Sequence, residues 1–169
     1  DKGELKFPYP LNEALASIAY IRKHADEYNI LNEHITVIGF SAGGHLAASS
    51  ALHYDDEELL KALDLSKGDT KINGVLLGYP VLLTGEKAHE GTRDNITQKR
   101  DNLINYFDIP SNVTNDYPPT FIWNTQNDNC VPTENSFAMV SALTKVGVKC
   151  EYHCFPTGPH GLSICSMDL

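Results

Sequence analysis

The run Gly39-Phe40-Ser41-Ala42-Gly43 is a G-x-S-x-G motif, in which a serine lies between two glycines. Such a serine can act as a nucleophile when the motif follows a buried strand and opens a helix. The flanking glycines let neighbouring backbone approach closely, and the helix N-terminus offers N–H groups to a developing oxyanion. We expect the backbone N–H of Ala42 to be the first oxyanion donor. Because the motif also arises by chance, we interpret Ser41 as a nucleophile only if the motif lies between a strand and a helix.

A serine nucleophile needs a general base, and the base needs a carboxylate to orient it. Among the seven histidines, His160 lies in a loop directly after a predicted strand. Asp128 follows the preceding strand in the same way, whereas Asp108 and Asp116 come before that strand. The carboxyl ends of parallel strands share one edge, where ligands bind. Ser41, Asp128 and His160 are therefore the candidate triad; a solvated loop histidine and a turn-capping aspartate are the alternatives.

Strands alternate with helices around these three residues. Short β-branched and apolar runs predict strands at 35–40, 72–78, 120–125 and 148–155. Apolar residues at three- and four-residue steps predict helices at 11–28, 42–53 and 134–146, and a short helix follows the acidic residues 55–58. Residues 66–70 are typical of a loop. The polar segment 84–117 is expected to be a lid-like insertion with one helix near 98–107. This order predicts an α/β fold, a mostly parallel sheet with helices on both faces.

Composition and charge exclude several classes of partner. The chain has 169 residues, a net charge of −9 and 41% apolar residues, without a basic patch. An acidic surface of this kind argues against binding to nucleic acid or to an anionic membrane. No run of about 18 apolar residues is present, so no membrane span is expected. Homo-oligomer formation is left open by the sequence.

The cysteine pattern is the sequence feature from which we predict the cellular compartment of the protein. The four cysteines are Cys130, Cys150, Cys154 and Cys165, and none belongs to a CxxC pair. Reduced thiols in a cytoplasmic protein are the simplest interpretation.

The chemistry expected of the triad requires neither a metal nor a cofactor.

Three segments together resemble the esterase/lipase branch of the α/β-hydrolases, most closely the acetyl-xylan-esterase-like carbohydrate esterases of bacteria. The segments are 38–47 (Ile-Gly-Phe-Ser-Ala-Gly-Gly-His-Leu-Ala), 118–123 (Pro-Pro-Thr-Phe-Ile-Trp) continuing to Asp128 and Val131-Pro132, and 158–162 (Gly-Pro-His-Gly-Leu). Tyr79-Pro80 and Asn135-Ser136-Phe137 also fit the pattern. The resemblance covers nearly the whole chain except 84–117, and it implies an α/β-hydrolase fold with a Ser-Asp-His triad.

The sequence lacks several features that surround the nucleophile in this family. We call the turn that carries Ser41, residues 39–43, the elbow. The family carries a glycine-rich loop that supplies a second oxyanion donor, and no such loop is found here. The family's strands before the elbow strand are also missing, the chain stops nine residues after His160, and position 124 is Asn where many relatives have His. We therefore expect residues 1–169 to be the carboxy-terminal part of one α/β-hydrolase domain, with the second donor outside the chain.

The resemblance implies a serine esterase that hydrolyses carboxylic esters through an acyl-enzyme. Small esters or acetylated sugars such as acetylated xylan are the implied substrates. The triad does not distinguish esters from amides, so a peptidase of the same fold is an alternative. A non-catalytic hydrolase-like binding domain, which keeps the elbow without a working oxyanion hole, is the alternative from another class.

Overall fold

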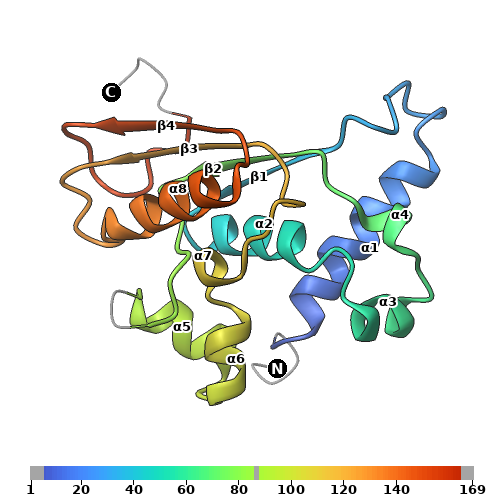
Figure 1. Cartoon of the computed structure of the whole chain (residues 1–169), viewed down its shortest axis with the longest axis horizontal. Helices are drawn as coiled ribbons and strands as arrows, with labels where there is room; N and C mark the ends of the chain where they lie inside the picture. Colours follow the sequence, from blue (N-terminus) through green and yellow to red (C-terminus); the bar gives the residue numbers. More distant parts are fainter. Residues whose placement is uncertain (1–5, 86–87, 165–169) are drawn as a thin grey trace.

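The computed structural model describes residues 6–85 and 88–164, which form a four-stranded sheet and a layer of helices (Figure 1). The strands are β1 (Thr36–Phe40), β2 (Gly74–Gly78), β3 (Thr120–Thr125) and β4 (Cys150–Phe155). The helices are α1 (Tyr9–Lys23), α2 (Ala42–Leu52), α3 (Glu57–Leu63), α4 (Lys67–Thr70), α5 (Glu90–Thr97), α6 (Asp101–Tyr106), α7 (Ile109–Asn112) and α8 (Glu134–Val146). Residues 1–5, 86–87 and 165–169, and with them Cys165, lie outside the described residues.

All four strands run parallel, in the order β1-β2-β3-β4. Gly39 of β1 is in register with Leu77 of β2, and Leu77 is in register with Ile122 of β3. The predicted parallel α/β sheet is thereby confirmed. β3 has the bounds that the sequence predicts, and each of the other strands begins one or two residues later than expected.

The helices cover one face of the sheet, as Figure 1 shows for α2 and α8. The core on that face joins Ala48 of α2 and Met139 of α8 to Leu77 and Ile122 of the strands. On the opposite face the side chain of Ile38 is 61% exposed. The sequence predicts helices on both faces, whereas the described residues place their helices on one. The physical reason is the strand order: right-handed crossovers that move steadily across a sheet all pass over the same face.

The insertion contains more helix than the sequence predicts. One helix near 98–107 is expected, but three short helices, α5, α6 and α7, are present. α5 and α6 lie on the side of the helix layer away from the sheet (Figure 1). They are anchored there by a second apolar cluster that joins Leu103 and Phe107 to Leu11 and Leu15 of α1. The bounds of the insertion, residues 84–117, and its role as a lid stay predictions.

Two other elements differ from expectation for local reasons. Residues 66–70 are predicted to be a loop, but Lys67–Thr70 form the single turn α4, because Ser66 and Asp69 make a reciprocal capping box. α1 ends at Lys23 rather than near residue 28. Within the described part of the chain, no helix combines the length and the apolarity that crossing a bilayer requires.

Candidate active site

Ser41 occupies the turn between β1 and α2, the strand–turn–helix context that the motif requires. Its φ of 53° and ψ of −123° lie outside the regions that non-glycine residues usually occupy. Such a conformation costs about 1–3 kcal/mol and persists only where the surroundings impose it. Two backbone hydrogen bonds do so here: the N–H of Ser41 donates to Gly78 at 3.0 Å, and the carbonyl of Ser41 accepts from Val81 at 3.1 Å.

The glycines of the elbow are not equivalent. A Cβ on Gly39 would overlap the carbonyl of Gly43 and lie 2.8 Å from the Cβ of Ala47. A Cβ on Gly44 would lie 2.8 Å from the Cβ of Pro80, whereas a Cβ on Gly43 would meet nothing within 4 Å. The close approach expected at both motif glycines is therefore found at Gly39 but not at Gly43. Gly44, the next residue, is the second one that must be small.

The structure brings Ser41, His160 and Asp128 together although they are far apart in the sequence. The Oγ of Ser41 lies 2.8 Å from Nε2 of His160. Nδ1 of the same ring lies 2.7 Å from Oδ2 of Asp128. The imidazole can thus accept the serine proton at one nitrogen while it donates to the carboxylate from the other. Each of the three residues follows the carboxyl end of a strand, as the sequence predicts.

Asp128 is held as a carboxylate by several donors. Its side chain is 1% exposed. Burial would raise the pKa of this carboxyl, but His160 and the N–H groups of Val131 and Cys130 donate to it and lower the pKa below its ordinary value. Oδ1 accepts the two backbone N–H groups, at 2.8 and 2.9 Å, which leaves Oδ2 for the imidazole. The network therefore favours the charged form that orients a histidine.

The loop that carries His160 is tied to the loop after β3. The N–H of Gly158 donates to Oδ1 of Asn127 at 2.8 Å, and the hydroxyl of Thr125 donates to the carbonyl of Gly158 at 2.7 Å. The sequence pattern singles out neither Asn127 nor Thr125. Their position just before Asp128, at the end of the same strand, is the signal that would have identified them.

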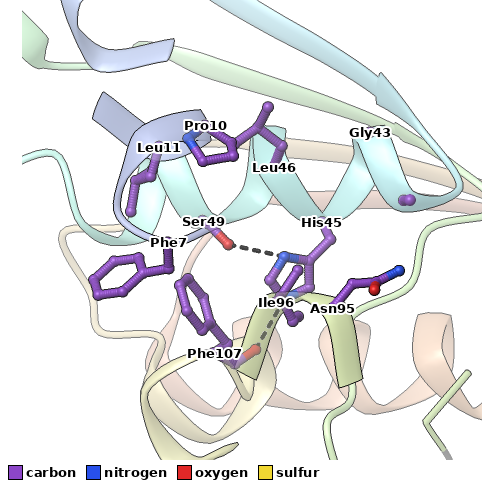
Figure 2. Close-up of a pocket in the computed structure, with 11 residues that line it drawn as sticks. Phe7, Pro10, Leu11, Gly43, His45, Leu46, Ser49, Asn95, Ile96 and Phe107 are labelled. Atoms are coloured by element: carbon purple, nitrogen blue, oxygen red, sulfur yellow. Dashed lines mark hydrogen bonds between the residues drawn. The ribbon is translucent and has the colours of Figure 1, made fainter. Parts of the chain in front are cut away.

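Ala42 is the first residue of α2, so its N–H is at the helix N-terminus, where N–H groups lack intrahelical acceptors. A cavity of about 320 Å³ opens beside Ala42 and Gly43 (Figure 2). Its walls are mostly apolar and include Leu11, Ile96 and Phe107. Ile96 belongs to α5, so the predicted insertion contributes to this cavity. The assignment of the second oxyanion donor to a segment outside the chain stays a prediction.

The buried ring of His45 forms part of the cavity wall (Figure 2). It lies 3.1 Å from the carbonyl oxygen of Phe107 through Nε2 and 3.1 Å from the hydroxyl of Ser49 through Nδ1. Burial lowers the pKa of His45 to about 4. This histidine is therefore neutral near pH 7 and belongs to the packing of α2, not to the triad. Among residues 6–85 and 88–164, no three His, Cys, Asp or Glu side chains are grouped as a metal site would need.

The chain resembles proteins from several bacteria. The acetyl ester-xyloside bifunctional hydrolase of Caldicellulosiruptor lactoaceticus has a similar crystal structure, with a TM-score of 0.85 and 35% identity over 97% of this chain and 61% of that one. Endo-1,4-beta-xylanase B of Butyrivibrio fibrisolvens is 34% identical over 164 residues, 95% of this chain and 25% of that protein. The acetylxylan esterase of Xylanibacter ruminicola is 26% identical over 159 residues, 90% of this chain and 31% of that protein.

The chain spans between a quarter and a third of these two curated relatives. The family model BD-FAE matches residues 2–143, which include the elbow, the insertion and Asp128. The structural neighbours confirm the α/β-hydrolase fold that the sequence resemblance implies. The chain belongs to the BD-FAE family of α/β-hydrolases.

Proposed function

We propose that Ser41, His160 and Asp128 form the catalytic triad of a serine esterase that hydrolyses carboxylic esters. The observation that carries this proposal is the continuous series of contacts, 2.8 Å from Ser41 to His160 and 2.7 Å from His160 to Asp128. The strained backbone of Ser41 adds support, because it directs the hydroxyl out of the strand-to-helix turn.

The proposed reaction has two steps. The Oγ of Ser41 attacks the carbonyl carbon of the ester while Nε2 of His160 takes the serine proton. The backbone N–H of Ala42 donates to the oxyanion of the tetrahedral intermediate. The C–O bond to the alcohol then breaks, and His160 protonates the departing oxygen. In the second step water attacks the acyl-enzyme, His160 accepts a proton from that water, and the carboxylic acid leaves as Ser41 regains its proton.

The substrates we propose are small esters, including acetyl groups on xylan or other sugars. This proposal rests on the relatives, one of which is named an acetylxylan esterase and another an acetyl ester-xyloside hydrolase. The triad geometry serves amides equally well, so the preference for esters comes from the names of the relatives. The apolar cavity beside Ala42, with Ile96 of the insertion in its wall, supports a role for residues 84–117 in shaping the substrate pocket.

Ester hydrolysis by purified protein tests the proposal. Acetate release from acetylated xylan and hydrolysis of p-nitrophenyl esters of increasing acyl length are measured for the full-length gene product. Ser41→Ala and Asp128→Asn are each expected to lower kcat by about 10³-fold or more, because one removes the nucleophile and the other leaves the imidazole in the wrong tautomer. Unchanged turnover in Ser41→Ala, or a folded full-length protein that cleaves peptides but no ester, contradicts the proposal.

A further inference from the structure

Tyr79 lies at the carboxyl end of β2, between the ends of the two strands that carry the elbow and the acid. Its N–H donates to the carbonyl of Trp123 at 2.6 Å, which extends the pairing of β2 with β3 by one residue. Its φ is +36°, a value that a bulky aromatic residue rarely adopts. The residue is 5% exposed. A strained, buried aromatic at this edge of the sheet indicates that something fixes it there, because such strain needs compensation.

The side chain of Tyr79 is in contact with the proposed base. Its ring centroid lies 4.8 Å from that of His160, with the two planes 69° apart. Its hydroxyl accepts the N–H of Ser163 at 2.9 Å, three residues beyond His160. One tyrosine thus holds both the imidazole ring and the backbone that follows it. In this contact the hydroxyl acts as the acceptor for the loop backbone.

Other aromatic rings hold Tyr79 in turn. Trp123 packs edge to face against it, with centroids 5.0 Å apart and planes at 84°. Phe40, the residue before Ser41, lies 5.8 Å away between centroids. Aromatic pairs at these distances and tilts are favourable beyond the area they bury. The ring of Tyr79 is therefore held by residues of the sheet as well as by its contacts with the His160 loop.

Asp128 alone does not determine the direction in which Nε2 of His160 points. A single hydrogen bond at Nδ1 lets the ring tilt and swing about that atom, and the two hydrogen bonds that tie the loop are at Gly158, two residues before the imidazole. We propose that Tyr79 is a positioning residue, whose ring and hydroxyl keep the His160 imidazole oriented with Nε2 toward Ser41. This inference rests on the proposed triad chemistry and adds a second restraint on the base.

Steady-state kinetics of Tyr79 variants test the inference. Tyr79→Leu removes the ring and the hydroxyl and is expected to lower kcat about tenfold or more while KM changes less than about threefold, because a misplaced base slows the chemical step. Tyr79→Phe keeps the ring but loses the hydrogen bond from Ser163, and it is expected to retain more activity than Tyr79→Leu. Phe155→Leu is the control, because the ring contacts of Phe155 among the described residues are with Trp123, 6.2 Å between centroids, and with His153, and none is with His160.

A second readout does not depend on turnover. The Nδ1–H proton of His160, which is hydrogen-bonded to Asp128, gives a low-field proton resonance in NMR spectra. We expect this resonance in the wild-type protein and in Tyr79→Phe, and its broadening in Tyr79→Leu while the amide spectrum stays dispersed. A Tyr79→Leu variant with wild-type kcat and an unchanged resonance overturns the inference. A wild-type full-length protein that shows the resonance but hydrolyses no ester overturns the proposed function, and the resonance in the variants still tests Tyr79.

Discussion

Two histidines are buried behind the elbow, outside the triad. His45 is 2% exposed and His53 is 9% exposed. The ring of His53 stacks on that of Tyr106, with centroids 3.9 Å apart and planes within 5°, and its buried Nε2 has no hydrogen-bond partner among the described residues. Burial lowers the pKa of both histidines to about 4. Neither ring can take up a proton in the folded state without a cost in free energy.

Acid should therefore destabilise the fold well above the range in which carboxylates titrate. In the unfolded chain each histidine titrates at about pH 6.5. The unfolded state therefore binds more protons than the folded state between that pH and about pH 4. The free energy of unfolding is therefore highest above about pH 6.5 and declines as the pH falls. Each histidine contributes a loss of roughly 3 kcal/mol once the pH is below about 4. Urea unfolding at a series of pH values from about 7 to 4 measures this decline.

His53→Phe is the informative variant for the pH experiment. It keeps a flat ring against Tyr106 and removes one of the two titrating groups. The slope of the free energy of unfolding against pH is expected to fall to about half, because each bound proton contributes up to about 1.4 kcal/mol per pH unit. A wild-type free energy of unfolding that stays level down to about pH 4.5 contradicts the burial of both rings as neutral groups.

At the scale of the element, the elbow depends on how closely β1 approaches α2. Gly39 marks the closest point, since any Cβ there meets the backbone of the first turn of α2. Gly44 marks the approach of α2 to Pro80, after β2. The sheet therefore sets the position of the helix N-terminus, and with it the direction of the Ala42 N–H.

Alanine substitutions at Gly39 and Gly43 are expected to change the free energy of unfolding by different amounts. Gly39→Ala is expected to lower the free energy of unfolding by about 2 kcal/mol or more, because backbone must move to relieve the overlap. Gly43→Ala is the matched control: it lies within α2, meets no neighbouring atom, and is expected to be neutral or stabilising by up to about 1 kcal/mol. Chemical denaturation of both variants measures the difference, and equal free energies of unfolding would contradict the packing described for the elbow.

The elements that position the proposed triad were the ones that a sequence pattern could predict. Residues 120–125 form a compact apolar run, and 134–146 have apolar residues at helical steps, so β3 and α8 match the prediction closely. α5 has no such stripe: its sequence is Glu-Gly-Thr-Arg-Asp-Asn-Ile-Thr, and its start depends on the ring of His89, which accepts the N–H of Thr92. A side-chain cap of this kind is a local interaction that hydrophobic periodicity does not report.

The same distinction holds for the site. The proximity of Ser41, Asp128 and His160 could be predicted because each follows a strand and parallel strands end at one edge. Tyr79 also follows a strand, but in the sequence it is singled out only as part of the Tyr79-Pro80 pair that fits the family pattern. Its contact with His160 depends on the conformation of the loop that returns over β2. That conformation is a property of tertiary packing.

At the scale of the whole molecule, the strand order determines how the three proposed catalytic residues meet. β1, β3 and β4 carry Ser41, Asp128 and His160 at their carboxyl ends, and β2 lies between β1 and β3 with Tyr79 at its end. The steady progression across the sheet keeps the crossover helices on one face and leaves the residues after each strand free to converge. All four strands of the described sheet thus contribute to the proposed site.

The central claim, that Ser41 is an activated nucleophile, is tested most directly by its reaction with a fluorophosphonate probe. The probe is added to the folded full-length gene product, and the peptide that contains Ser41 is analysed by mass spectrometry, with Ser41→Ala as the control. The account predicts one covalent adduct, on Ser41, that is absent from Ser41→Ala. A folded protein with no adduct, or with its adduct on another serine, would contradict it.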